Sequence, residues 1–484
     1  MRFLFNFFPG FYYNIEVTDM ANDLLRYIPK TDVLLAREAI KEAADRHPHA
    51  IVKAAVKEQL DELRAAIRAG RIDAIPPIEE IEKTIVFKLD DGQNFKLKRL
   101  INATGVVLHT NMGRAPLGDE IAAHVAEVSK GYSNLEYDTE LGKRGSRYSH
   151  IESLLCEITG AEAAMVVNNN ASAVFLMLNT LAKGKKVAIS RGEAVEIGGA
   201  FRIPEIMKAS GAELCEVGCT NKTHGKDYIK AMEEDGVEVI LKAYTSNYIV
   251  SGFSQSVDCK EMAQIAHDRG GIAIYDQGSA FMFLPEELGL HVGVCVNNAI
   301  KDGMDVVSFS GDKLIGGAQG GFIIGKKEYI QAIKKNQLTR MMRIDKMSLA
   351  SFEIILQYCR DAKLAMEKIP TLHMLTLKAE DCYARAERLQ KEINEMAPNC
   401  PTKIVPVKDE AGAGSLAGVL FDGYAVAVKV PGLSDVKAED MLHKRGVPIV
   451  CRVNKDGLLF STRTIFDQNY AEIAKAIYDL SIAK

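Results

Sequence analysis

The sequence predicts an α/β fold with a mixed, mostly parallel sheet and helices on both faces, a helical domain before it and a small α+β domain after it. Two observations carry this prediction. Between residues 99 and 350, short runs rich in Val and Ile alternate with helical patterns, as buried strands and their crossover helices do. On either side of that region the pattern changes: it is helical before it and a mixture of helix and strand after it.

The N-terminal region divides into a leader, a helical domain and a linker. We interpret residues 1–19, an aromatic stretch that makes a poor signal peptide, as a leader that is either non-native or disordered. In residues 20–76, apolar residues recur every three or four positions, Pro48 interrupts the pattern and Gly70 marks a helix end. Residues 77–98 read as a linker with a short helix. The helical domain has nearly balanced charges, which favours a packed bundle over a nucleic-acid recognition module.

The central region, residues 99–350, supplies the expected strands of the sheet. They are the runs AAMVVNN, KVAIS, VEVILKAYT, IAIYD, DVVSFS and GFIIGK. In a doubly wound sheet, ligands bind at the carboxyl ends of the strands, so we expect the functional residues there. In residues 351–484 a long helical stretch is followed by three expected strands, GSLAGVLF, AVAVKV and GLLFSTRTI.

Composition excludes several classes of protein. The net charge of −4 over 484 residues argues against a cationic nucleic-acid coat protein. No apolar run approaches the roughly 20 residues that span a bilayer, so no membrane association is expected. The nine cysteines include no CxxC pair, which predicts no metal site and fits reduced thiols in a cytosol.

Three chemical features follow expected strands. VVNNNASAV places an amide-rich turn at the start of a helix, where an anion can bind, although the same pattern caps ordinary helices. Asp276 ends the strand IAIYD, where a turn-initiating aspartate is also common. Lys313 lies just beyond the strand DVVSFS, among small residues. Each feature alone is weak, and their order along the chain is more specific.

The ordered set matches the needs of pyridoxal phosphate. Lys313 would hold the aldehyde as a Schiff base, Asp276 would keep the pyridine nitrogen protonated, and the amide turn would hold the phosphate. We attribute the glycines around Lys313 to the close approach of a bulky cofactor–substrate adduct. No nucleotide-binding loop of the GxxxxGK[ST] or GxGxxG type is present.

Arginines gather in segments that could bind anions. Arg340 and Arg343 are three residues apart, so on a helix they would share one face, either as a phosphate-binding fork or as a solvated surface. The remaining candidates are Arg114, Arg144 and Arg147.

Long segments of the chain resemble one family. INATGVVLHTNMGRAPL, YSNLEYDTELGKRGSRYSHIE, VVNNNASAV, SRGEAVEIGGAFRIP, EVGCTNKTH, SFSGDKLIGGAQGG and QLTRMMRIDKMSL together look like bacterial selenocysteine synthase, the L-seryl-tRNA(Sec) selenium transferases. These are fold-type I pyridoxal phosphate enzymes. The resemblance covers residues 25–350 well and the C-terminal part more loosely.

The resemblance implies a role for each candidate residue. Lys313 would be the Schiff-base lysine and Asp276 the partner of the pyridine nitrogen. The selenophosphate anion would meet Arg114, Arg340 and Arg343. Further contacts with the cofactor would come from Asn169, Asn170, Ala171, Ser172 and Ser310.

The resemblance also implies a reaction and its partners. L-seryl-tRNA(Sec) would lose water by β-elimination, and selenium from selenophosphate would add to the dehydroalanyl group to give L-selenocysteyl-tRNA(Sec). The N-terminal helical domain would hold the tRNA, which reverses the preference from charge alone. The enzyme would be a cytoplasmic homo-oligomer, a ring of dimers that forms a decamer, with sites shared between subunits.

Departures from the family pattern leave an alternative open. Gln277 and Ala280 stand where the family has Leu and Gly, and Cys219 stands where it has Thr. A lyase or ammonia-lyase for a small phosphorylated amino compound would use the same Lys313, Asp276 and arginines, but it has no use for a separate helical domain. A non-catalytic scaffold would need neither Lys313 nor Asp276.

Overall fold

The computed structural model describes residues 24–72, 74–92, 96–199 and 201–483, so the expected leader, residues 1–19, lies outside the described residues. The chain forms two compact units, Met1–Arg99 and Leu100–Lys484. Among the described helices, none is long and apolar enough to cross a membrane. Within the same residues, no cluster of His, Cys, Asp and Glu could hold a metal ion.

The N-terminal unit is helical, as predicted. The helices given for its described residues are α2 (Thr31–Leu35), α3 (Glu38–Ala44), α4 (His49–Arg68) and α5 (Ile78–Gly92). Pro48 is the N-cap of α4, and Gly70 follows that helix with a φ of 64°, a conformation that glycine adopts without strain. The helices bury a small apolar core that includes Leu34, Ile40, Val52, Val56, Leu60, Ile81, Ile85 and Leu89.

The prediction that residues 77–98 form a linker with a short helix is wrong for most of that range. Helix α5 occupies 15 of these residues, and its Ile81, Ile85 and Leu89 belong to the core of the helical unit. Salt bridges also tie α5 to the unit, including one of 2.8 Å between Arg37 and Glu82. The apolar spacing of IEEIEKTIVFKL is that of an amphipathic helix, and the two prolines before it mark a helix start.

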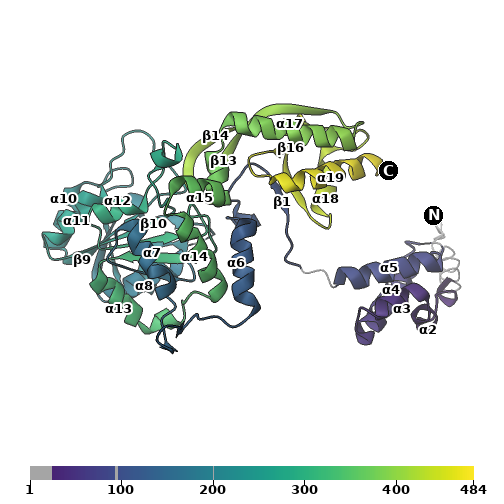
Figure 1. The fold of residues 1–484 in the computed structure, drawn as a ribbon, viewed down its shortest axis with the longest axis horizontal. Coiled ribbons are helices and arrows are strands. Elements are labelled where there is room, and N and C mark those ends of the chain that lie inside the picture. The colour runs from purple at the N-terminus through teal and green to yellow at the C-terminus, as the bar shows by residue number, and fades with distance from the viewer. Residues whose placement is uncertain (1–23, 73, 93–95, 200, 484) are drawn as a thin grey trace, which may run out of the picture. The chain divides into compact units, whose positions relative to one another are not determined.

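A seven-stranded sheet organises the larger unit (Figure 1). Its strand order is β4-β12-β11-β10-β9-β5-β8, and only β12 runs antiparallel to its neighbours. The six expected strands are all present; β8 was not predicted. The bounds are β4 Ala163–Val167, β5 Lys186–Ser190, β8 Glu213–Val217, β9 Val237–Ala243, β10 Ile272–Gly278, β11 Val306–Ser310 and β12 Gly321–Gly325.

Helices cover both faces of this sheet, which confirms the doubly wound architecture. One apolar cluster joins the sheet to α8 (Asn170–Leu181), α9 (Ile203–Ala209) and α13 (Lys327–Lys335). A second cluster lies on the other face. Its helices include α7 (Ser149–Thr159), α10 (Gly225–Glu234), α11 (Cys259–His267), α12 (Val296–Lys301) and α14 (Lys346–Tyr358). Helix α6 (Gly118–Lys130) packs along α14.

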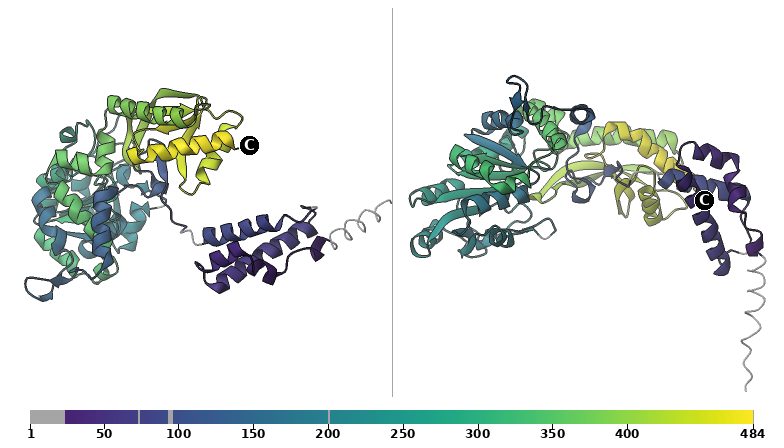
Figure 2. Two further views of the ribbon diagram at one scale, coloured as in Figure 1. Left: turned by 45° about the vertical axis from the view of Figure 1, so that its right-hand side comes forward. Right: turned by 90° about the horizontal axis from the view of Figure 1, so that it is seen from below.

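The C-terminal part is an α+β layer built on a five-stranded sheet (Figure 2). Helices α17 (Ala379–Met396), α18 (Asp435–His443) and α19 (Tyr470–Ile482) pack on one face of it. The strand order is β1-β15-β16-β14-β13, with bounds β1 Ile101–Ala103, β13 Thr402–Gly412, β14 Ser415–Val428, β15 Ile449–Asn454 and β16 Gly457–Ser461. Strand β1, from the start of the unit, pairs in parallel with β15.

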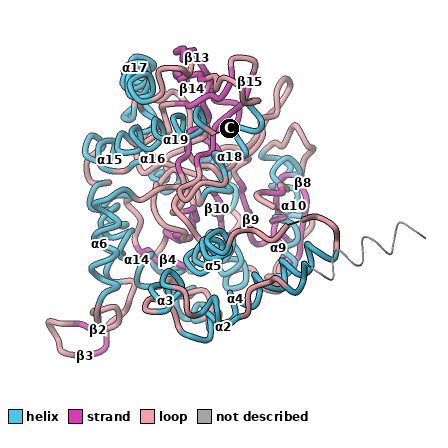
Figure 3. The backbone as a smooth tube through the Cα atoms, turned by 90° about the vertical axis from the view of Figure 1, so that its right-hand side faces the viewer, coloured by secondary structure: helices cyan, strands magenta, loops and turns pink. Residues whose placement is uncertain are grey.

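The structure places the junction between the central and C-terminal regions after residue 350. Helix α14 spans that position and is followed by α15 (Ala362–Lys368) and α16 (Pro370–Thr376), whose buried residues belong to the core of the large sheet. Two short hairpins complete the unit, β2–β3 (Tyr137–Asp138, Lys143–Arg144) and β6–β7 (Glu196–Ile197, Phe201–Arg202). Figure 3 shows the β2–β3 hairpin projecting from the body.

Candidate active site

The carboxyl ends of β4, β10 and β11 bring the predicted residues to one edge of the sheet. Asp276 lies on β10 and is paired in register with Ser308 on the neighbouring strand β11. Lys313 follows β11 by three residues, and Asn170 begins α8 directly after β4. Asp276 and Lys313 are 3% and 6% exposed, so both ionisable groups are buried in the protein interior.

The two oxygens of the Asp276 carboxylate have different surroundings. Its Oδ1 accepts hydrogen bonds from Asn170 Nδ2 at 2.8 Å, from the Gly278 amide at 3.0 Å and from Ser308 Oγ at 3.4 Å. No described residue donates to Oδ2. Burial raises the pKa of this carboxyl above its usual value, while the Asn170 hydrogen bond and then the charge of Lys313 act to lower it.

Burial lowers the pKa of the Lys313 amine, and the nearby carboxylate of Asp276 partly opposes that effect. No hydrogen bond or ion pair ties the amine to any described residue. A buried lysine with a lowered pKa has more of the neutral amine that carbonyl chemistry requires. This environment therefore fits the nucleophile predicted from the sequence.

The glycines around Lys313 have a different role from the one expected. A Cβ atom at Gly311, Gly317 or Gly320 would lie 2.4, 2.7 or 2.5 Å from the ring of Phe352, and one at Gly316 would meet Ile369 at 2.4 Å. The loop therefore wraps closely around side chains of α14 and the segment that follows it. The expectation that these glycines make room for a cofactor–substrate adduct is wrong, because protein side chains occupy the space.

The start of α8 offers free amides for an anion. Asn169 is the N-cap, and its side chain accepts a hydrogen bond of 2.8 Å from the Ser172 amide. The amides of Asn170 and Ala171 lie in the first turn, where a helix supplies no internal acceptor. A Cβ at Gly321 of β12 would lie 2.2 Å from the Asn169 carbonyl oxygen, so the strand fixes the position of this turn by close backbone contact.

Among the predicted arginines, Arg114 lies near the lysine. Its Nη1 pairs with Asp312 Oδ2 at 2.6 Å, and its charge contributes to lowering the pKa of Lys313. Sequence reasoning missed the role of Asp312, although its place directly before the lysine was a usable signal. Ser310 is the last residue of β11 and is buried.

Arg340 and Arg343 do not share a helix face, so that part of the prediction is wrong. The short 3₁₀ helix η4 (Gln337–Arg340) ends at Arg340, and Arg343 forms an isolated bridge with Val167 at the end of β4. Both arginines line a cavity of 330 Å³ with Glu136 and other basic residues, among them Arg144, Arg147, Lys334 and Lys335. Neither Lys313 nor Asp276 lines this cavity in the single chain.

The carboxylate of Glu136 organises the arginine cavity. Arg147 donates to Glu136 Oε1 from Nε at 3.0 Å and from Nη2 at 2.6 Å. Arg144 and Arg343 lie 3.5 and 3.6 Å from the same carboxylate. The Arg147 contact, followed by the charges of Arg343 and Arg144, keeps the pKa of Glu136 below its usual value despite partial burial. One carboxylate thus faces several cations, which leaves the cavity suited to anions.

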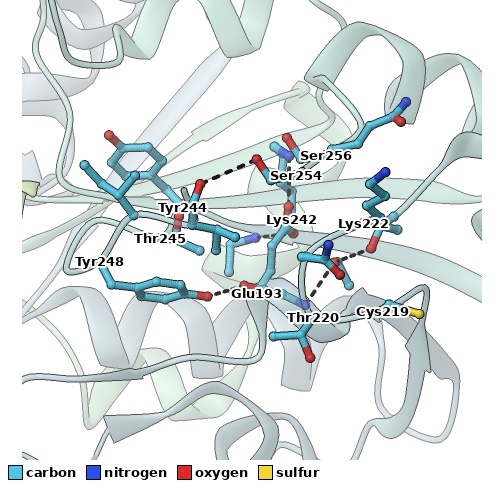
Figure 4. Close-up of a pocket in the computed structure, with 18 of the residues that line it drawn as sticks. Glu193, Cys219, Thr220, Lys222, Lys242, Tyr244, Thr245, Tyr248, Ser254 and Ser256 are labelled. Atoms are coloured by element: carbon cyan, nitrogen blue, oxygen red, sulfur yellow. Dashed lines mark hydrogen bonds and ion pairs between the residues drawn. The ribbon is translucent and has the colours of Figure 1, made fainter. Parts of the chain in front are cut away.

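A larger cavity of 530 Å³ opens at the ends of β5, β8 and β9 (Figure 4). Among the lining residues, Lys242 Nζ pairs with Glu193 Oε1 at 3.0 Å; Glu193 is buried and Lys242 is partly buried. Cys219, one of the departures from the family pattern, lines the cavity together with Thr220. The other two, Gln277 and Ala280, are buried and follow Asp276 closely in the sequence.

The residues at the strand ends fit pyridoxal phosphate. Lys313 supplies a buried amine that no described residue pairs with, Asp276 has one carboxylate oxygen to which no described residue donates, and the start of α8 supplies amides for a phosphate. The hydrogen bond between Asn170 and Asp276 was not predicted, since sequence spacing does not reveal where a side chain points.

Comparisons with known proteins agree on one family. A family model described as L-seryl-tRNA selenium transferase matches residues 100–466, and one described as selenocysteine synthase N terminal matches residues 25–64. The L-seryl-tRNA(Sec) selenium transferase of Caldanaerobacter subterraneus subsp. tengcongensis is 42% identical over 95% of this chain and 99% of its own length. The corresponding protein of Clostridium botulinum strain Okra is 42% identical over 92% of this chain and 96% of its own length.

A solved structure supports the fold. D-Glucosaminate-6-phosphate ammonia-lyase superposes with a TM-score of 0.55 at 18% identity, covering 82% of this chain and 98% of that one. At that identity the likeness concerns the fold alone.

Proposed function

The chain belongs to the L-seryl-tRNA selenium transferase family, and on that premise we propose that it converts seryl-tRNA(Sec) into selenocysteyl-tRNA(Sec). The observation that carries the proposal is the match of residues 100–466 to the family model, a range that includes the buried Lys313 and Asp276 of this chain. The alternative lyase shares the fold, but the additional match of residues 25–64 to the selenocysteine synthase N terminal favours the transferase.

Pyridoxal phosphate is the cofactor, and when bound it supplies an aldehyde that links to amines and a ring that accepts electrons from the substrate α-carbon. Lys313 would hold the aldehyde, and its amine, when not bound there, would be the simplest base for the substrate α-proton, because its lowered pKa favours the neutral form. Asp276 would keep the ring nitrogen protonated through Oδ2, to which no described residue donates.

Selenophosphate is the proposed selenium donor. Arg114, which pairs with Asp312 next to Lys313 in the sequence, would contact this anion through its remaining guanidinium donors. Arg340 and Arg343 line the separate arginine cavity of the same chain. A homo-oligomer in which a neighbouring copy supplies such arginines would unite the three residues. We propose shared sites for that reason, and a ring of dimers because the family resemblance implies one.

The N-terminal helical unit is the proposed binding site for the tRNA. The match of residues 25–64 to the family supports this assignment, as does the independent core of the unit. Its own charges do not identify an RNA surface. The reaction uses an aminoacyl-tRNA, and we therefore propose a cytoplasmic location.

Transfer of radioactive selenium tests the proposal. Protein purified with pyridoxal phosphate should move selenium from selenophosphate to seryl-tRNA(Sec). Lys313→Ala should abolish both transfer and the visible absorbance of the lysine-bound cofactor, and Lys437→Ala, at an exposed position, should change neither. Turnover of a small phosphorylated amino compound without tRNA retention would favour the lyase. Failure of the wild type to take up pyridoxal phosphate would refute both functions.

A further inference from the structure

Asn170 has a place in the site beyond the cofactor phosphate. Its backbone begins α8, and its side chain reaches across to the end of β10, where Nδ2 donates to Asp276 Oδ1 at 2.8 Å. The same helix start that offers amides to an anion therefore also holds the carboxylate. The start of α8 would therefore position the phosphate of the cofactor directly and the ring of the cofactor through Asp276.

The structure fixes this turn from the other side. A Cβ at Gly321 would lie 2.8 Å from the Asn170 Cα and 2.2 Å from the Asn169 carbonyl oxygen, so β12 passes directly against the backbone. The side chain of Asn170 consequently starts from a position that cannot shift easily. A fixed backbone is what a residue needs in order to hold a second residue in place.

The orientation of the Asn170 amide depends on Asp276. The Oδ1 of the Asn170 amide is buried and accepts no hydrogen bond from any described residue. Reversing the amide would bring two acceptor oxygens together, because an ionised carboxylate accepts but does not donate. The observed orientation, with the amide donating to Oδ1, therefore suits the ionised form of Asp276.

The protein consequently holds one oxygen of the Asp276 carboxylate and leaves the other available to a ligand. Three donors, from Asn170, Gly278 and Ser308, converge on Oδ1, and Oδ2 has none among the described residues. Among the influences that favour ionisation of this buried group, the Asn170 hydrogen bond ranks ahead of the charge of Lys313, and both oppose the raised pKa that burial causes. Hydrogen bonds to a charged acceptor are the stronger class of such contacts.

We propose that Asn170 is the positioning residue of Asp276: its amide holds Oδ1 so that the ionised carboxylate presents Oδ2 to the ring nitrogen of the cofactor. This inference rests on the proposed function, since it requires pyridoxal phosphate at the site. It assigns Asn170 a role in the electronic properties of the bound ring, in addition to the phosphate contact expected from its place in the turn.

The test compares two ligands that differ in one atom. Wild type, Asn170→Ala and the control Asn298→Ala, an exposed asparagine in the first turn of α12, are titrated with pyridoxal phosphate and with an analogue in which CH replaces the ring nitrogen. Loss of one hydrogen bond to a buried charge changes an equilibrium by about tenfold. Asn170→Ala should therefore weaken binding of pyridoxal phosphate about tenfold more than binding of the analogue.

Two results of this titration would contradict the inference. Equal weakening of both ligands by Asn170→Ala, or no weakening of either, would overturn the inference, because a phosphate contact or a general structural role does not distinguish the ring atom. Asn170→Leu, which keeps the branching at Cγ and has no donor, provides the same comparison if the alanine variant does not fold. A wild type that binds neither ligand would refute the proposed function instead.

A second measurement reports directly on the ring. With cofactor labelled at the ring nitrogen with ¹⁵N, the chemical shift shows whether that nitrogen is protonated. In the wild type and in Asn298→Ala it should stay protonated at neutral pH, whereas in Asn170→Ala the proton should be lost at a lower pH. An unchanged titration of the ring nitrogen in Asn170→Ala would contradict the proposed role.

Discussion

Replacing Gly320 with alanine would place a methyl carbon 2.5 and 2.7 Å from two ring carbons of Phe352, with Val166 at an ordinary 3.5 Å. Carbon atoms prefer separations of about 3.5–4.0 Å, so the overlap is roughly 1 Å. Phe352 is fully buried and packs edge-on against Phe322 with ring centroids 4.7 Å apart, so its ring has little room to move. Overpacking of this kind costs about 1–3 kcal/mol.

Urea unfolding of the wild type, Gly320→Ala, Phe352→Leu and the double variant would measure this cost, with Gly446→Ala as a fifth protein for control. Gly320→Ala should lower the free energy of unfolding by about 1–3 kcal/mol, and in a Phe352→Leu background the same change should cost at least about 1 kcal/mol less, because the clashing ring is gone. Gly446→Ala is the matched control: no heavy atom of the described residues lies within 4 Å of the added Cβ, and a change below about 0.5 kcal/mol is expected. A neutral Gly320→Ala, or the same cost in both backgrounds, would refute the packing explanation.

Three further predictions concern charges. In cofactor-free protein, Lys313→Met should raise the free energy of unfolding at neutral pH, because the lowered pKa of Lys313 in the folded state means that charging this amine opposes folding. The gain should fade as the pH rises toward 10.5, the unfolded-state pKa, since the amine is then increasingly neutral in both states. Thermal unfolding across pH checks this. Asp409→Ala should cost about 3–5 kcal/mol in urea unfolding, because it leaves the fully buried Arg463 without its carboxylate, whereas Lys408→Ala on the same strand should cost less than about 1 kcal/mol. Arg114→Ala should raise the KM for selenophosphate about ten- to a hundredfold through loss of a charge-assisted contact, and a normal KM, as expected for the exposed Arg360→Ala, would argue against the assignment.

The central sheet could be predicted because its strands are buried on both faces. Continuous Val and Ile runs such as KVAIS and GFIIG identify such strands without knowledge of the partners. Strand β8, ELCEV, was missed because its glutamates interrupt the run at the sheet edge, where exposure is tolerated. The half-exposed β13 has a weaker pattern for the same reason.

The candidate site could be predicted in its positions but not in its contacts. Asp276 and Lys313 were found because parallel strands end at a common edge. The bond from Asn170 to Asp276 and the pair of Arg114 with Asp312 join residues 106 and 198 positions apart, and only the fold brings them together. The role of the glycines was misread because their neighbour, Phe352, comes from a helix beyond the loop.

Strand β1 has a consequence for how the larger unit is made. The ribosome synthesises Ile101–Ala103 early, but their partner in the sheet, Ile449–Cys451, emerges only near the end of the chain. Until then β1 has no strand beside it, and its backbone groups remain satisfied by water. The helical unit, with contacts local in sequence, can acquire its structure during synthesis, whereas the catalytic unit closes only after release of its last strands. Truncation at the C-terminus would therefore also remove the anchor of the segment that leads into the site.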